Sequence, residues 1–196
     1  DSDAFYSAET TYSWYIIPNF QVAELQNENL RYAIGFAIDR EALVNNILKD
    51  GSIAKYDCNY SQVFFDAEGN EFNSVREDFW AVDKERAAQY WEAAKSDLGV
   101  ETLALDMLVE DTESAQRVAV FLQSEIEGAC PGLTINLLVV PKTQRIEQME
   151  TGDFVLALHR TGSSVPNVAA KLGQYTTDHN LNYGDYSDPA YDELYY

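Results

Sequence analysis

Leu103-Ala-Leu-Asp-Met-Leu-Val109 opens the stretch of sequence that decides the fold. Its Leu, Leu, Met and Val residues share one face of an extended chain, which predicts a strand with one buried side. Helical spacing follows from about residue 114 to 127, then a strand from 134 to 140, a short helix from 143 to 150 and the wholly apolar strand Phe154-Val-Leu-Ala-Leu158. This β-α-β-α-β order predicts an α/β fold whose sheet is mostly parallel, with flanking helices and the last strand at its centre.

One more strand and several helices are predicted on either side of this stretch. Residues 10–17 are β-branched and aromatic, which is typical of a strand, and Pro18 ends it. Gly51 and Gly99 are predicted to end two helices. Residues 52–82 lack sustained periodicity and predict a wrapped surface segment. Helix starts are predicted at N-cap residues, which are Asn27, Asp39, Asp83 and Asp188.

The composition supports a folded chain and excludes two classes of function. With 196 residues, 46% of them hydrophobic, the chain can bury a sizeable core as one large domain. Its 33 acidic and 13 basic residues give a net charge of −20, which would repel a nucleic-acid backbone. No apolar run approaches the roughly 18 to 20 residues that cross a bilayer. We therefore expect neither a nucleic-acid partner nor a membrane-spanning helix.

The sequence gives little support to catalysis or to a bound metal. Cys58 and Cys130 lack the CxxC spacing of zinc and redox sites, so they are either two free thiols or one disulfide. Motifs of the HExxH, GxGxxG and Walker A types are missing from the sequence, and we expect no metal and no cofactor. A triad of Glu110, His159 and Ser163 can be drawn, but the GxSxG elbow that would present its nucleophile is missing.

The candidate site follows from the predicted sheet. Ligands of an open parallel sheet bind beyond the carboxyl ends of its strands, here residues 110–114, 141–143 and 159–164. The acidic start of the first segment is either a cation site or the capping end of the next helix. Tyr12 and Trp14 are either core residues or part of an aromatic recognition surface.

Four segments along the chain share a pattern with one known family. They are Asn29-Leu-Arg-Tyr-Ala-Ile-Gly-Phe-Ala-Ile-Asp-Arg-Glu-Ala-Leu-Val44 with Leu48-Lys-Asp-Gly51, Asp83-Lys-Glu-Arg-Ala87 with Trp91 and Gly99, Gly152-Asp-Phe-Val-Leu-Ala157, and Tyr183-Gly-Asp-Tyr-Ser-Asp-Pro-Ala-Tyr-Asp192. In this order they resemble signatures of extracellular solute-binding protein family 5. Its members are the oligopeptide- and dipeptide-binding components of ABC importers.

The resemblance implies one lobe of a two-lobed receptor that closes on an extended peptide. Residues 1–196 would form the larger C-terminal, ligand-binding lobe as a single unit, with the other lobe absent and both chain ends cut. The implied function is the substrate-binding component of an ABC importer, with no enzymatic activity, which delivers oligopeptides to the permease subunits. We expect a monomer outside the cytoplasm, as a cell-surface lipoprotein or in a periplasm.

One departure from the family pattern bears on the cargo. The family's peptide binders carry a Trp and, three residues later, an Asp that pairs with the peptide's α-ammonium, where this chain has Thr161 and Ser164. A hydroxyl does not replace the charge of a carboxylate. The cargo is therefore a peptide clamped elsewhere, a blocked peptide or another solute, such as an oligosaccharide or a nickel chelate; a peptide-sensing surface receptor is a further alternative. The predicted ligand-binding residues are Arg160, Thr161, Gly162, Ser163, Ser164, Tyr12, Trp14, Glu110 and Thr112.

Overall fold

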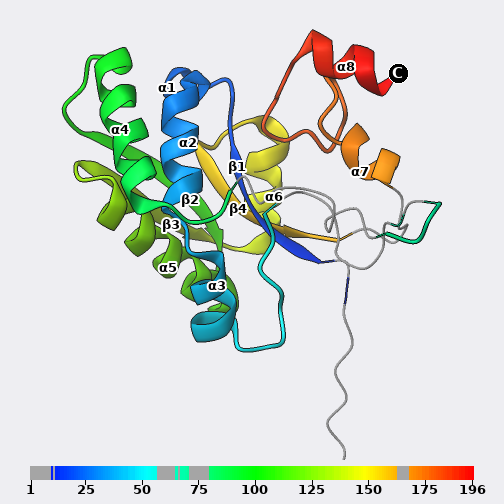
Figure 1. Ribbon diagram of the computed structural model, residues 1–196, viewed down its shortest axis with the longest axis horizontal. Helices are drawn as coiled ribbons and strands as arrows, with labels where there is room; N and C mark the ends of the chain where they lie inside the picture. The colour runs from blue at the N-terminus through cyan, green and yellow to red at the C-terminus, as the bar shows by residue number, and fades with distance from the viewer. Residues whose placement is uncertain (1–9, 11, 57–64, 66, 71–79, 163–167) are drawn as a thin grey trace, which may run out of the picture.

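A four-stranded sheet forms the centre of the computed structural model, which describes residues 10, 12–56, 65, 67–70, 80–162 and 168–196 (Figure 1). The strand order is β1-β4-β2-β3. β2 pairs in parallel with both β3 and β4, whereas β1 runs antiparallel to β4. The predicted α/β fold with a mostly parallel sheet is confirmed. The strands are β1 Ser13–Pro18, β2 Leu103–Glu110, β3 Leu133–Val140 and β4 Leu156–Thr161.

The predicted β-α-β-α-β unit is present as β2-α5-β3-α6-β4. The helices are α1 Ala23–Gln26, α2 Glu28–Ala37, α3 Arg40–Ala42 with the π-helix η2 Leu43–Leu48, α4 Lys84–Leu98, α5 Glu113–Ala129, α6 Lys142–Thr151, α7 Val168–Gly173 and α8 Pro189–Tyr195. The helix caps predicted from the sequence are present. A side-chain oxygen accepts a hydrogen bond from a first-turn backbone amide at Asn27, Asp39, Asp83 and Asp188.

Some predicted boundaries are wrong. β1 begins at Ser13 rather than at residue 10, and it includes Pro18. β4 begins at Leu156 rather than Phe154 and continues to Thr161, because β1 supplies a hydrogen-bonding partner for its polar end. The helix after Asp39 continues as the π-helix η2 and ends at Lys49 in a left-handed conformation (φ 52°), two residues before the predicted Gly51. Thus residues 159–161 belong to the sheet and not to a loop.

The sheet is covered differently on its two faces. Helices α2, α4 and α5 pack on one face and bury the main core, whose largest fully buried side chain is Trp91 (Figure 1). On the other face a smaller core forms between the sheet and α6 around Leu108, Met149, Phe154 and Ala157. The apolar half of β4 therefore lies between two packed layers, as predicted from its sequence.

Several predictions fall partly outside the described residues. Of the surface segment 52–82, the structure describes 52–56, 65, 67–70 and 80–82, with a turn at residues 67 and 68. Cys130 is a free, buried thiol, and Cys58 lies outside the described residues. Within the described part of the chain, no helix has the length and apolar character needed to span a bilayer.

Candidate ligand-binding site

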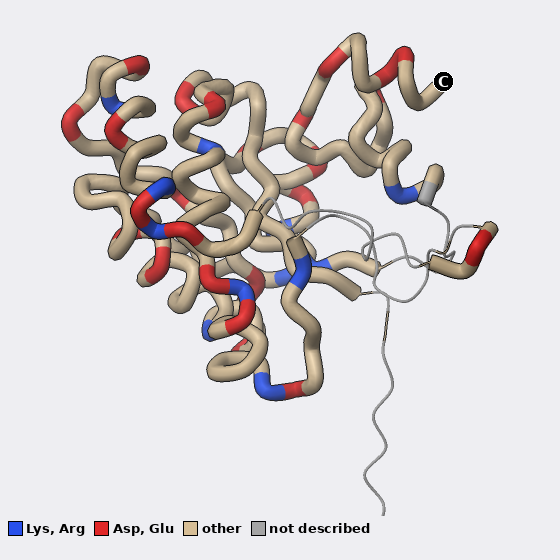
Figure 2. Tube along the Cα trace, viewed as in Figure 1, with Lys and Arg blue, Asp and Glu red and all other residues tan. Residues whose placement is uncertain are grey.

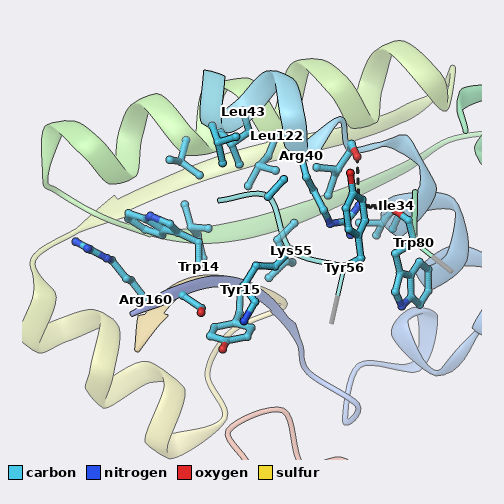
Figure 3. A pocket seen from close by; sticks show the side chains of 18 of the residues that line it. Trp14, Tyr15, Ile34, Arg40, Leu43, Lys55, Tyr56, Trp80, Leu122 and Arg160 are labelled. Atoms are coloured by element: carbon cyan, nitrogen blue, oxygen red, sulfur yellow. Dashed lines mark hydrogen bonds between the residues drawn. The ribbon is translucent and has the colours of Figure 1, made fainter. Parts of the chain in front are cut away.

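Two cavities adjoin at the end of the sheet where β2 and β4 finish. We call the first the small cavity; its volume is about 300 Å³. The second, which we call the large cavity, has a volume of about 850 Å³ and extends between β1, α2 and residues 50–56. Figure 3 shows Trp14 and Arg160 at one end of the large cavity and Arg40, Tyr56 and Trp80 at the other. The small cavity is lined by Tyr12, Trp14, Glu110, Thr112, Ser114, Lys142, Arg145, Leu158 and Arg160.

The two cavities share a wall that the β1–β4 pairing builds. Trp14 lies opposite Arg160 in the antiparallel register, so both side chains project from the same face of the sheet. The Arg160 guanidinium lies 5.1 Å from the Tyr12 ring centre and 5.6 Å from that of Trp14. These are cation-π distances, and they hold the guanidinium at the boundary between the two cavities.

A buried arginine from α6 ties the small cavity to the sheet. Arg145 is only 3% exposed, and its Nη2 lies 3.0 Å from Oε2 of Glu110. Its Nη1 lies 2.6 Å from Nδ1 of His159 and 3.3 Å from Sδ of Met149. Because Arg145 is a donor only, the Nδ1 atom of His159 acts as the acceptor. One cation therefore connects the ends of β2 and β4.

His159 is electrically neutral in the folded protein near neutral pH. Burial lowers the pKa of His159 to about 4, and the positive charges of Arg145, Lys171 and Lys142 add to the effect. A protonated imidazole would place a second cation against Arg145. The Arg145–His159 contact thus requires the uncharged ring.

This lowered pKa predicts a loss of stability in mild acid. Between pH 6.5 and about pH 4 the unfolded chain protonates His159 and the folded chain does not, so the free energy of unfolding falls as the pH falls. We expect the decrease to be roughly 1 to 3 kcal/mol. The control is His159→Gln, whose amide oxygen accepts from Arg145 without titrating. Urea unfolding at pH 7 and pH 4.5 should show a smaller decrease for this variant; equal decreases would contradict the assignment.

The structure gathers most of the predicted site residues around one cavity. The small cavity is lined by five of them, which are Tyr12, Trp14, Glu110, Thr112 and Arg160. Thr112 is also the N-cap of α5, since its Oγ1 accepts from the Ala115 amide. This favours the capping interpretation of the segment's acidic start.

The remaining predicted residues lie at the edge of this region. Thr161 pairs with Ser13 in the sheet. Gly162 lies against the Tyr12 ring, and a β-carbon there would come within 3.2 Å of the ring. Ser163 and Ser164 lie outside the described residues. The Glu110 carboxylate contacts Arg145, an arrangement that differs from the triad drawn with His159.

The sequence analysis did not predict a role for Arg145 or for Lys142, and it did not predict the large cavity. A signal for Arg145 was present, because Arg145 and Met149 are one helical turn apart and both are buried. A charged residue on the apolar side of a helix indicates a partner in another element. Lys142 lies in a segment that was predicted to face the site. Among the described residues, no group of three or more His, Cys, Asp or Glu side chains is arranged to hold a metal ion.

The comparisons with known proteins agree with one another. The profile described as bacterial extracellular solute-binding proteins, family 5 Middle, matches residues 1–183. A dipeptide-binding protein of Lactococcus lactis subsp. cremoris (strain MG1363) is 28% identical over 179 residues, which are 91% of this chain and 32% of that protein. The chain thus spans about a third of the length of this relative.

Two solved structures share the fold closely. A peptide-binding protein of a peptide ABC transporter has a TM-score of 0.89 at 29% identity, covering 94% of this chain and 82% of that one. The peptide-bound structure of OppA from Listeria monocytogenes has a TM-score of 0.88 at 26% identity, covering 94% of this chain and 37% of that one. The predicted family resemblance is confirmed by these matches.

Proposed function

Because the chain belongs to the bacterial extracellular solute-binding proteins of family 5, we propose that it is the ligand-binding lobe of a receptor that delivers oligopeptides to an ABC importer. The observation that supports this most is the pair of adjoining cavities at the carboxyl ends of β2 and β4. Their volumes of about 300 and 850 Å³ match those of ligand pockets, and aromatic rings and a few charged groups line them.

The proposal includes a second lobe that closes over these cavities. A peptide bridging both lobes would stabilise the closed state, because binding shifts the equilibrium by its difference in affinity for the two states. In this proposal residues 1–196 form one lobe, and the receptor acts as a monomer without catalysis. It works outside the cytoplasm, anchored by a lipid or free in a periplasm, and passes its cargo to permease subunits.

The strongly acidic surface supports a small-solute cargo over a nucleic acid. Figure 2 shows acidic residues spread over the helices and the C-terminal segment. With a net charge of −20, a polyanion would be repelled over most of the surface. A short peptide carries little net charge, so this field repels it much less than it repels a polyanion. Salt also screens the field beyond about 10 Å from the surface.

Calorimetry on the two-lobed receptor tests the function. We expect heat from a mixed library of short peptides, and we expect Trp14→Ala to weaken peptide binding about tenfold or more, since buried aromatic contacts dominate binding energies. The control is Tyr196→Ala, which removes an aromatic ring that is 90% exposed and outside both cavities. Heat of binding from oligosaccharides but not from peptides would contradict the proposed peptide cargo. Uptake of peptides by cells with the gene deleted separates import from sensing.

A further inference from the structure

We propose that Lys171 and Tyr183 are positioning residues, which hold the wall between the two cavities from its rear and thereby set the affinity for the cargo. By the rear we mean the face of the sheet that carries Tyr15 and His159. Neither Lys171 nor Tyr183 lines either of the two cavities, so both act through the strands of the wall. This inference rests on the proposed function, because that function places the cargo against the wall.

The wall carries different side chains on its two faces. In the β1–β4 register Tyr15 lies opposite His159, one residue along from the pair of Trp14 and Arg160. Because side chains alternate along a strand, Tyr15 and His159 project from the face opposite that of Trp14. Figure 3 shows Trp14 and Tyr15 on opposite sides of β1. A single planar peptide unit joins these two residues, so a shift of Tyr15 moves Trp14 as well.

A buried lysine of α7 contacts β1 from the rear. Lys171 is only 3% exposed, and its Nζ lies 4.5 Å from the centre of the Tyr15 ring. The same Nζ lies 5.8 Å from the centre of the Tyr175 ring and donates to Oε1 of Gln174 at 3.2 Å. Lysine is almost never fully buried unless it is paired, and cation-π contacts are strongest at desolvated sites. The contact between Lys171 and Tyr15 therefore anchors α7 on β1.

The chain after α7 contacts the wall at two further points. The Tyr183 ring packs edge-on against the His159 ring of β4, with the ring centres 5.8 Å apart, and lies beside the smaller core. The next residue, Gly184, accepts a hydrogen bond from the Phe20 amide at 2.8 Å. A β-carbon at Gly184 would lie 2.5 Å from the Pro18 carbonyl oxygen, at the end of β1. This close approach holds Tyr183 in place behind β4.

Lys171 also acts on β4 through its charge. Burial is the main cause that lowers the pKa of His159 to about 4, and the charges of Arg145 and Lys171 add to the effect. A positive charge lowers the pKa of an imidazole in this way only when it lies close to the ring. One side chain of α7 therefore contacts β1 and influences β4, which are the two strands of the wall.

Removing the ammonium group leaves Tyr15 without its cation. Lys171→Met keeps an apolar stem but loses the cation-π contact and the hydrogen bond to Gln174. Binding groups keep their geometry only when the residues around them are fixed, so the wall is then held less firmly. Residues that touch no ligand change binding severalfold by this route.

The test is calorimetry on the two-lobed receptor with the peptide of the mixed library that binds most tightly. We expect Lys171→Met to raise the Kd about fivefold and Tyr183→Leu to raise it about threefold or more. The control is Tyr191→Phe, which loses the hydrogen bond to the Leu172 carbonyl oxygen between α8 and α7 and should leave the Kd within about twofold. Circular dichroism checks that each variant is folded. Tyr183 is only half-buried, so its variant tests the wall even where Lys171→Met does not fold.

A second measurement separates positioning from general destabilisation. In a receptor that already carries Trp14→Ala, Lys171→Met should raise the Kd by less than about twofold, because the side chain that it positions is gone. An equal loss in both backgrounds, an equal loss in Tyr191→Phe, or unchanged binding by folded Lys171→Met or Tyr183→Leu overturns this inference alone. Failure of the unaltered receptor to bind any peptide overturns the proposed function, and this inference with it.

Discussion

Replacing Trp91 with alanine is expected to lower the free energy of unfolding by roughly 3 to 5 kcal/mol, which is the usual cost of removing a buried tryptophan. Trp91 is fully buried in α4 and packs within the main core. Its Nε1 also donates to the Pro131 carbonyl oxygen at 2.8 Å, which ties α4 to the turn before β3. Both the apolar contacts and this hydrogen bond are lost in the alanine variant.

Two controls separate these contributions. Trp91→Phe keeps an aromatic ring but loses the hydrogen bond to Pro131 and part of the buried ring, and we expect it to cost about 1 to 3 kcal/mol. Leu194→Ala, at a side chain that is 90% exposed, should change stability by less than about 0.5 kcal/mol. Urea unfolding followed by circular dichroism measures all three. A cost below about 1 kcal/mol for the alanine variant would show that Trp91 is not central to the core.

The second large effect is expected at the buried cation of α6. Arg145→Met should destabilise the protein by about 2 to 4 kcal/mol, because it leaves the Glu110 carboxylate and the His159 ring without their partner. Glu110 is 21% exposed, so water recovers part of the loss. The methionine keeps most of the side-chain length beside Met149, which limits the cavity it creates.

A double-mutant cycle identifies the cause. In Glu110→Gln with Arg145→Met no unpaired charge remains, so the double variant should lose at least about 1 kcal/mol less than the two single losses added together. Chemical denaturation at pH 7 measures the loss in free energy of unfolding for each single variant and for the double variant. Simple additivity would mean that Arg145 acts through packing and not through its charge. Lys84→Met, which breaks an exposed pair with Glu125, is the matched surface control.

Local patterns predicted much of the fold. The β-α-β-α-β order followed from periodicity within each element, and the helix starts followed from side chains that reach an amide two or three residues away. Both periodicity and helix caps depend only on residues that are close together in the sequence. They explain why the boundaries at Asn27, Asp83 and Asp188 agree with the structure.

The errors arise where distant parts of the chain decide the local structure. The end of β4 was predicted as a loop because His159, Arg160 and Thr161 are polar, but β1 pairs with all three. Arg145 was missed because its partners lie in β2 and β4. Topology alone predicted a candidate site at the carboxyl ends of the strands, whereas the strand pairing that forms the wall between the two cavities was not predicted.

The pairing of the first strand with the last one also constrains the order in which the protein forms during synthesis. Ser13 finds its partner only when Thr161 has left the ribosome, whereas β2, α5 and β3 can associate as soon as they emerge. We expect the aromatic residues of β1 to stay uncovered until β4 has emerged, which makes this strand a candidate for contact with a chaperone. Translation that stops before residue 161 would leave part of β1 without the strand that pairs with it in the wall between the two cavities.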